Sequence, residues 1–324
     1  MKAIEYTTYG PPEVLQIVEV PRPVPGDHEV LINIRATTVT ATECTFRQGK
    51  PYFSRLFTGL RKPKITRLGE EMAGVIEAIG PKVTKHQVGD EVFGTAGPEF
   101  GANAEYICLP EDGVFTRKPT NVSFVEAAAC CDGFLTALPF LRDKGKIKRG
   151  QRVLIYGASG SVGSSAVQIA RYYGAEVTGV CSTDNLELVR SLGAQHVIDY
   201  RRADFTQNGQ TYDIIFDAVG KTTFPRCKNS LTEQGRFLAA GIKLGIFLHV
   251  IRTAGFGKKK ALIAATGLRP PHERIKDLDL LKDLIQEGAI KLVIDKSYAL
   301  EDIAEAHRYV DQGHKKGNIV IYTA

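Results

Sequence analysis

The chain has 324 residues, of which 43% are hydrophobic and 24% charged, values typical of a globular protein with room for two domains. Its formal net charge of +6 comes from scattered basic clusters without interleaved aromatic residues, so we expect no nucleic-acid partner. No run of eighteen apolar residues is present, and residues 1–14 lack the apolar segment of a signal peptide. We therefore expect a cytoplasmic protein without a membrane partner.

The first 122 residues predict a mainly β domain. Strand-forming stretches at 30–34, 74–80 and 91–93 are separated by turn residues, and prolines punctuate the early part of this region. The pattern favours a barrel-like domain with few helices.

From Ser123 onward the pattern changes to alternating helices and strands. Ser123 and Glu126 form a predicted capping box, and Pro139 is expected to bend or interrupt the helix that follows. The predicted strands are 152–156, 176–180, 196–198, 213–216, 236–240 and 262–265, and helices are predicted at 185–192, 278–287 and 303–310. Alternation of this kind indicates a doubly wound parallel sheet.

Two further strands, 293–295 and 318–322, are predicted in the tail. The expected layout is an α/β protein in which residues 123–267 form a dinucleotide-binding domain. Residues 1–122 and 268–324 together form the other domain.

A glycine-rich loop is the strongest local signal. The stretch YGASGSVG at 156–163 follows an apolar strand and opens an amphipathic helix. Gly157 is expected to make the tight turn, Gly160 to let the backbone approach a pyrophosphate, and Gly163 to pack the helix on the sheet. The residues expected to hold the anion are Gly157, Ala158, Ser159, Gly160, Ser161, Val162 and Gly163. A glycine-lined turn without a ligand is the alternative.

The end of the second predicted strand bears on the choice of cofactor. That strand ends at Cys181, Ser182 and Thr183, without the carboxylate that usually binds the ribose of NAD. Asp184 is expected to cap its own helix in a box with Glu187. Ser182 and Thr183 can hydrogen-bond a 2′-phosphate, and Tyr200, Arg201 and Arg202 can supply stacking and charge, with a solvated loop as the alternative for the arginines. This pattern favours NADPH, with NADH possible.

Over its whole length the sequence resembles the zinc-independent, quinone oxidoreductase-like branch of the medium-chain dehydrogenases/reductases, whose bacterial members are often labelled NAD(P)-dependent alcohol dehydrogenases. The matching stretches include LGEEMAGVIEAIG, VGDEVFG, GASGSVGSSAVQIARYYGAEV, YDIIFDAVG and GHKKGNIVIY. The resemblance implies a GroES-like β-barrel catalytic domain, a Rossmann domain, and an active site in the cleft between them. It also implies that Thr136, Asp217, Val219, Gly220, Ala240 and Gly241 line the nicotinamide. A homodimer paired along an edge strand within 258–266 is implied as well, and the apolar stretch 246–251 is expected to line a substrate pocket or a dimer contact.

The same resemblance bears on metal binding. In zinc-dependent relatives a His and a Glu stand where this chain has Glu70 and Glu71, and two cysteine ligands stand where it has Thr40 and Asp132. All nitrogen and sulfur ligands are thereby lost, so we expect no zinc. An oxygen-only site for a harder cation is the alternative. Glu70 is expected at a cleft rim or surface, and Glu71 is expected to turn inward and accept hydrogen bonds.

Candidate proton donors or relays lie between residues 38 and 52. They are Thr40, Thr42, Thr45 and Tyr52, each with a packing role as its alternative. Quinone oxidoreductase relatives often carry Asn at position 40 and Tyr at position 45, so this chain departs from their donor set. The expected function is NADPH-dependent, zinc-free hydride transfer to quinones or α,β-unsaturated carbonyls as small-molecule substrates. The alternatives are an alcohol/carbonyl oxidoreductase and a catalytically silent NADPH-binding sensor.

Overall fold

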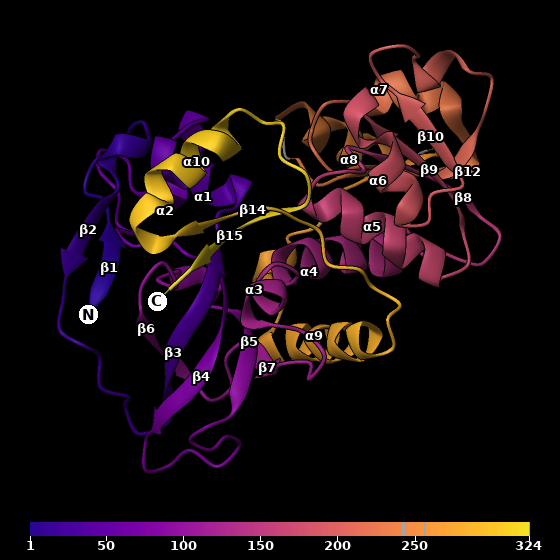
Figure 1. The fold of residues 1–324 in the computed structure, drawn as a ribbon. Helices are drawn as coiled ribbons and strands as arrows, with labels where there is room; N and C mark the ends of the chain where they lie inside the picture. The colour runs from indigo at the N-terminus through magenta and orange to yellow at the C-terminus, as the bar shows by residue number, and fades with distance from the viewer. Residues whose placement is uncertain (242–243, 256, 324) are drawn as a thin grey trace. The chain divides into compact units, whose positions relative to one another are not determined.

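The computed structural model describes residues 1–241, 244–255 and 257–323, which divide into two compact units (Figure 1). The first unit comprises Met1–Asp132, Pro270–Glu287 and Leu292–Ala324, and the second comprises Gly133–Arg269 and Gly288–Lys291. The boundary falls at 132/133 instead of 122/123, because helix α3 (Phe124–Ala128) packs against strands β3 and β4 of the first unit.

The second unit is built on a six-stranded parallel sheet. Its strands are β8 (Arg152–Tyr156), β9 (Glu176–Cys181), β10 (His196–Asp199), β11 (Tyr212–Asp217), β12 (Leu231–Ala239) and β13 (Lys260–Leu262). Their spatial order is β10-β9-β8-β11-β12-β13, the order of a doubly wound sheet that reverses between β8 and β11. The predicted sheet is thus confirmed, although β12 begins earlier and β13 ends earlier than expected.

Apolar strands explain why this sheet forms. Val153, Leu154 and Ile155 of β8 are fully buried, as expected for a strand with both faces covered. The helices of this unit are α4 (Cys131–Pro139), α5 (Ser161–Tyr172), α6 (Leu186–Ser191), α7 (Phe224–Cys227) and α8 (Leu244–Gly255). Helix α4 begins at the unit boundary and ends at Pro139, where a π-helical turn (Phe140–Lys144) follows it, so the predicted interruption is confirmed.

The first unit contains a mixed sheet to which both ends of the chain contribute. Its strands are β3 (Glu29–Thr38), β4 (Glu71–Ile79), β5 (Glu91–Thr95), β6 (Tyr106–Pro110), β7 (Phe115–Arg117), β14 (Ile294–Ala299) and β15 (Asn318–Tyr322), beside a small hairpin of β1 (Lys2–Glu5) and β2 (Gln16–Glu19). Strand β15 pairs antiparallel with β3, which confirms that the tail returns to the first domain.

Four further helices belong to this unit: α1 (Ala41–Gln48), α2 (Arg55–Thr58), α9 (Pro271–Gln286) and α10 (Ile303–Asp311). Helix α9 begins seven residues before its predicted start at 278, because Pro271 occupies the first helical position, where proline is favourable. The capping box of Ser123 and Glu126 is present as predicted.

One helical stretch, Phe124–Lys144, is long and apolar enough to cross a membrane. However, 72% of its most apolar window is buried inside the protein, as in the core helix of a globular domain. The stretch is therefore explained by packing.

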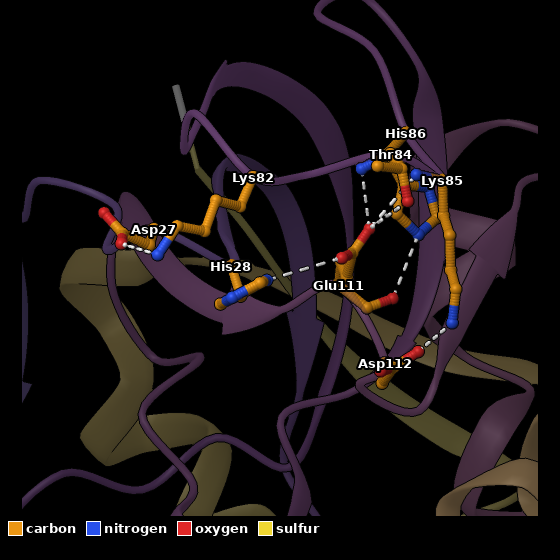
Figure 2. A network of polar contacts seen from close by, with 8 residues as sticks. All are labelled: Asp27, His28, Lys82, Thr84, Lys85, His86, Glu111 and Asp112. Atoms are coloured by element: carbon orange, nitrogen blue, oxygen red, sulfur yellow. Dashed lines mark hydrogen bonds and ion pairs between the residues drawn. The ribbon is translucent and has the colours of Figure 1, made fainter.

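A polar network at the surface of the first unit joins two turns (Figure 2). The carboxylate of Glu111 accepts hydrogen bonds from the backbone N–H groups of Thr84 at 2.9 Å and Lys85 at 3.1 Å. The Nε2 atom of His86 lies 3.3 Å from the backbone oxygen of Glu111. These backbone donors lower the pKa of Glu111.

Candidate active site

The glycine-rich loop has the turn and the packing that its sequence predicts. Gly157 has a φ of +82°, a conformation that favours glycine. A Cβ atom at Gly163 would lie 2.0 Å from the carbonyl oxygen of Gly157, so only glycine lets α5 approach the strand end this closely. Gly160 is the N-cap of α5 and makes no side-chain cap, which leaves the first N–H groups of this helix directed out of its N-terminus.

Two further loops lie at the carboxyl edge of the sheet: 217–220 contacts the glycine-rich loop, and 240–241 contacts 217–220. A Cβ atom at Gly157 would lie 2.6 Å from the side chain of Val219, and one at Gly241 would lie 2.6 Å from the Cα atom of Gly220. The backbone N–H of Ala240 donates to the carbonyl oxygen of Asp217 at 3.0 Å. Residues predicted to line a nicotinamide, from the ends of β11 and β12, are therefore brought together beside the loop predicted to hold the pyrophosphate.

Asp217 holds one of these loops in shape. Its carboxylate is 1% exposed and accepts the N–H groups of Val219 at 3.3 Å, Lys221 at 3.2 Å and Thr222 at 3.1 Å. Burial nevertheless raises the pKa of Asp217. Asp217 therefore positions the loop that follows β11, which places Val219 and Gly220 at the carboxyl edge of the sheet.

Helix α4 reaches the start of α5. A Cβ atom at Gly133 would lie 2.8 Å from Ser161 Oγ, which is buried and has no hydrogen-bond partner among the described residues. Thr136 lies one turn further along α4 and is half-buried. Ser159 Oγ is occupied, since it accepts a hydrogen bond from Asn185 Nδ2 at 2.9 Å.

The residues predicted near a 2′-phosphate also gather at one place. Tyr200 N–H donates to the carbonyl oxygen of Cys181 at 3.1 Å, and its side chain is exposed. Ser182 and Thr183 follow β9 directly, and Arg201 and Arg202 follow β10.

Two carboxylates, those of Asp184 and Asp199, already contact residues predicted near the 2′-phosphate. Asp184 lies 3.7 Å from Arg201 Nη1, and the predicted capping box of Asp184 with Glu187 is wrong, because α6 begins at Leu186 without a side-chain cap. Asp199, the last residue of β10, accepts a hydrogen bond from Thr183 Oγ1 at 2.5 Å and lies 3.5 Å from Arg202 Nε. The sequence reasoning missed Asp199, although its position at a strand end beside Tyr200 was a usable signal.

The first unit holds a cluster of buried carboxyl groups around Glu71. Glu71 is 1% exposed, and its two oxygens accept hydrogen bonds from Thr38 Oγ1 at 2.5 Å and from the N–H of Asp132 at 2.7 Å. The predicted inward orientation of Glu71 is confirmed. Glu70 is half-buried, and its pKa is raised by burial and by the charges of Asp132 and Glu71.

Glu43 is a second buried member of this cluster, and the sequence reasoning missed it. It is fully buried on α1, and its carboxylate accepts hydrogen bonds from Asn103 Nδ2 at 3.1 Å and from the N–H of Glu70 at 3.4 Å. Burial raises the pKa of Glu43 to about 7 and that of Glu71 to about 8, where the charge of Asp132 adds to the effect. Burial lowers the pKa of nearby Lys315. The cluster therefore retains protons near neutral pH.

The predicted donors lie along and after α1. Thr40 Oγ1 caps α1 by accepting the N–H of Glu43 at 3.1 Å, so this hydroxyl has a structural role. Thr42 is exposed in the first turn, and Thr45 is half-buried further along the helix. Tyr52 is 70% exposed, and the guanidinium of Arg55 lies 5.0 Å from its ring centre.

The residues at the family's zinc-ligand positions do not fit zinc. Thr40, Glu70 and Asp132 offer only oxygen atoms, and the hydroxyl of Thr40 is engaged in capping α1. In the described part of the chain, no group of three or more His, Cys, Asp or Glu side chains is arranged to hold a metal ion.

Comparison with known proteins places this geometry in a family. Residues 26–119 match the family described as alcohol dehydrogenase GroES-like domain, and residues 192–321 match that described as zinc-binding dehydrogenase. The quinone oxidoreductase of Homo sapiens is 31% identical over 97% of this chain and 94% of its own length. The chloroplastic NADPH-dependent alkenal/one oxidoreductase of Arabidopsis thaliana is 30% identical, covering 99% of this chain and 79% of its own length. The structure of Escherichia coli quinone oxidoreductase complexed with NADPH has a TM-score of 0.85 at 25% identity, over 99% of this chain and 100% of that chain.

The fold and these matches define the chain as an oxidoreductase of the medium-chain dehydrogenase/reductase family. Within that family it belongs to the quinone oxidoreductase-like group, as the sequence motifs predicted. The match to a zinc-binding family covers residues 192–321 and includes none of the three ligand positions.

Proposed function

We propose that this chain is an NADPH-dependent, zinc-free oxidoreductase that transfers hydride to quinones or α,β-unsaturated carbonyls. The observation that carries this proposal is the meeting of three strand-end loops, 157–163, 217–220 and 240–241, at the point where the strand order reverses. The names of its relatives support the substrate class, since one is a quinone oxidoreductase and another an alkenal/one oxidoreductase.

The residues of the second unit fit a dinucleotide. Because α5 has no side-chain cap, its N–H groups and dipole can hold a pyrophosphate. A Cβ atom at Gly160 would meet only the oxygen of Gly157, at 3.7 Å, so the space above this residue is open to a ligand. Ser161 Oγ, which has no partner among residues 1–241, 244–255 and 257–323, offers a further hydroxyl. When bound, the cofactor supplies the hydride.

Preference for NADPH is inferred from the end of β9. This strand ends without a carboxylate of its own, and Ser182 offers a hydroxyl there. The ion pair of Arg201 with Asp184 is long and exposed, so it holds the guanidinium weakly and leaves it available for a 2′-phosphate. Two relatives are described with NADPH, which supports the same choice.

The donor chemistry favours conjugated acceptors. When hydride adds to a quinone or an enone, the negative charge spreads onto an oxygen that hydroxyl and N–H donors can stabilise. A simple alcohol or ketone depends more on a Lewis acid at its oxygen, and the oxygen donors at positions 40, 70 and 132 do not suit zinc. This difference favours quinones and α,β-unsaturated carbonyls over simple alcohols and ketones as substrates.

Cofactor oxidation tests the proposal directly. The purified protein is assayed with a panel of quinones, enones, aldehydes and simple alcohols, with NADPH beside NADH and with a stoichiometric metal determination. We expect oxidation of NADPH by quinones or enones and no dependence on added zinc. Tight NADPH binding without turnover on any acceptor would favour the sensor, and zinc-dependent oxidation of alcohols would favour an alcohol dehydrogenase.

A further inference from the structure

A pocket lies in the second unit, at the amino-terminal edge of the parallel sheet. This open pocket of about 330 Å³ is lined by residues at the start of four adjacent strands and in the loop before β11, among them Arg152, Glu176, His196, Asn208, Gln210 and Tyr212. The candidate cofactor loops lie at the carboxyl edge, one strand length away. The five residues of β8 span roughly 13 Å between first and last Cα atoms, so a ligand in this pocket would not compete with a dinucleotide.

Two opposite charges line the pocket, Arg152 and Glu176, and each makes its contact with another residue. The sheet register places Arg152 and Glu176 directly opposite each other on neighbouring strands. Opposite charges in such positions normally attract each other. Here Arg152 Nη2 donates to Thr211 Oγ1 at 2.9 Å, whereas Glu176 Oε1 lies 3.0 Å from His196 Nε2.

This arrangement leaves unused hydrogen-bonding capacity on both charged groups. A guanidinium carries five N–H donors and a carboxylate about four acceptor sites. No ion pair joins Arg152 and Glu176 among the residues that the structure describes, and both side chains face the same pocket. A cationic site and an anionic site therefore stand side by side.

The rest of the lining supports a small polar ligand. Thr178 and Tyr212 are buried, at 6% and 4% exposure, and form a fixed floor. Asn208 Nδ2 donates to Tyr212 Oη at 3.2 Å, and the exposed amide of Gln210 lies at the rim. The volume lies near the lower end of the range for ligand pockets, which suits a metabolite of few atoms.

We infer that this pocket binds a small zwitterion of the free α-amino acid class. Its carboxylate would be bound by the guanidinium of Arg152, which matches a carboxylate with two parallel N–H donors. Its ammonium group would be bound by Glu176, and the amides of Asn208 and Gln210 would contact its side chain. This inference does not depend on the proposed reaction.

Calorimetric titration with free L-glutamine, L-glutamate and L-lysine tests the inference, with the intact protein both cofactor-free and saturated with NADPH. We expect saturable binding of at least one of these probes in both states. Arg152→Gln and Glu176→Gln should each weaken it by about tenfold or more, as expected for a lost charge-assisted hydrogen bond. Glu187→Gln, which alters an exposed carboxylate on α6 outside the pocket, should leave it unchanged.

Melting curves by circular dichroism establish that the variants are folded. If Arg152→Gln fails to fold, Glu176→Gln and amide chemical-shift changes at Thr178 and Gln210 decide the question. Absence of saturable binding for all three probes would overturn the inference. Binding that Glu176→Gln does not weaken would overturn it as well.

Discussion

The carboxylate of Glu71 accepts a hydrogen bond from the backbone N–H of Asp132 at 2.7 Å, although 61 positions separate the two residues in the chain. Its other oxygen accepts from Thr38 Oγ1. Glu71 thereby joins the start of β4 to β3 and to the segment that follows α3. Glu71, which follows the position where zinc-dependent relatives carry a His ligand, thus serves as a buried hydrogen-bond acceptor within the first unit.

Glu71→Gln should destabilise the first unit. At about pH 9, above the pKa of about 8, Glu71 is ionised and accepts from both Thr38 and Asp132. A glutamine amide has one acceptor oxygen and one NH₂ group, so it cannot accept from both. A buried donor left without a partner costs about 1–3 kcal/mol. Urea unfolding at about pH 9, followed by circular dichroism, measures the loss. Glu77→Gln on the same strand, where the side chain is exposed and pairs with Arg22, is the matched control and should change stability little.

The pH dependence of stability should reflect the raised pKa values of Glu43 and Glu71. Because the folded pKa values of about 7 and about 8 exceed the unfolded value of 4.5, the folded state binds more protons between these limits. Stability from these two groups is therefore fully present below pH 4.5 and is lost as the pH rises toward about 8.

Glu43→Gln should flatten this dependence, and melting temperatures measured across that pH range test it. Glu111 contributes to the pH dependence of stability with the opposite sign, because the backbone donors seen in Figure 2 lower its pKa. Glu111→Gln should therefore affect stability at neutral pH and leave the slope above pH 4.5 unchanged. A slope that Glu43→Gln does not alter would contradict the assignment.

The sequence predicts the cofactor edge of the second unit better than the carboxyl cluster of the first. The strand at β8, the turn at Gly157 and the start of α5 follow from neighbouring residues, so their geometry is readable from a short stretch. Glu43 acquires its role through Asn103 and Glu70, which lie 60 and 27 positions away, and no local pattern marks a carboxylate as buried.

The wrong prediction for Asp184 has a similar cause. The spacing of Asp184 and Glu187 suits a capping box, but the chain turns once more through Thr183–Asn185 before α6 begins. Arg201 then provides a partner from a loop after β10. A local pattern is overridden here by a contact between loops that are adjacent only in the folded sheet.

Arg201→Ala should shift the choice of cofactor. If NADPH binds as proposed, removing this guanidinium should raise the KM for NADPH about tenfold, because a charge-assisted contact with the 2′-phosphate would be lost. The KM for NADH should stay nearly constant, since NADH carries no phosphate at that position. Arg190→Ala removes an exposed arginine from α6 in the same unit and serves as the control. Equal changes for both cofactors would refute the role of Arg201.

Three glycine-to-alanine variants should separate folding from cofactor binding. Gly163→Ala places a methyl group 2.0 Å from the oxygen of Gly157, so it should cost about 1–3 kcal/mol or prevent folding. Gly160→Ala meets only one atom, at 3.7 Å, and should fold normally, yet its methyl group stands where a pyrophosphate would approach. We expect Gly160→Ala to weaken NADPH binding by about tenfold in a calorimetric titration.

Gly245→Ala is the control for helix propensity. Gly245 lies in α8, and no atom lies within 4 Å of a Cβ placed there, so alanine should be neutral or slightly stabilising. Gly163 also lies in the first turn of its helix, α5, but it is buried, and alanine there adds the clash with Gly157 that Gly245→Ala lacks. If Gly163→Ala were as stable as Gly245→Ala, the close approach of α5 to the strand end would be incorrect. If Gly160→Ala bound NADPH as tightly as the unchanged protein, the pyrophosphate would have to be held elsewhere on the sheet edge.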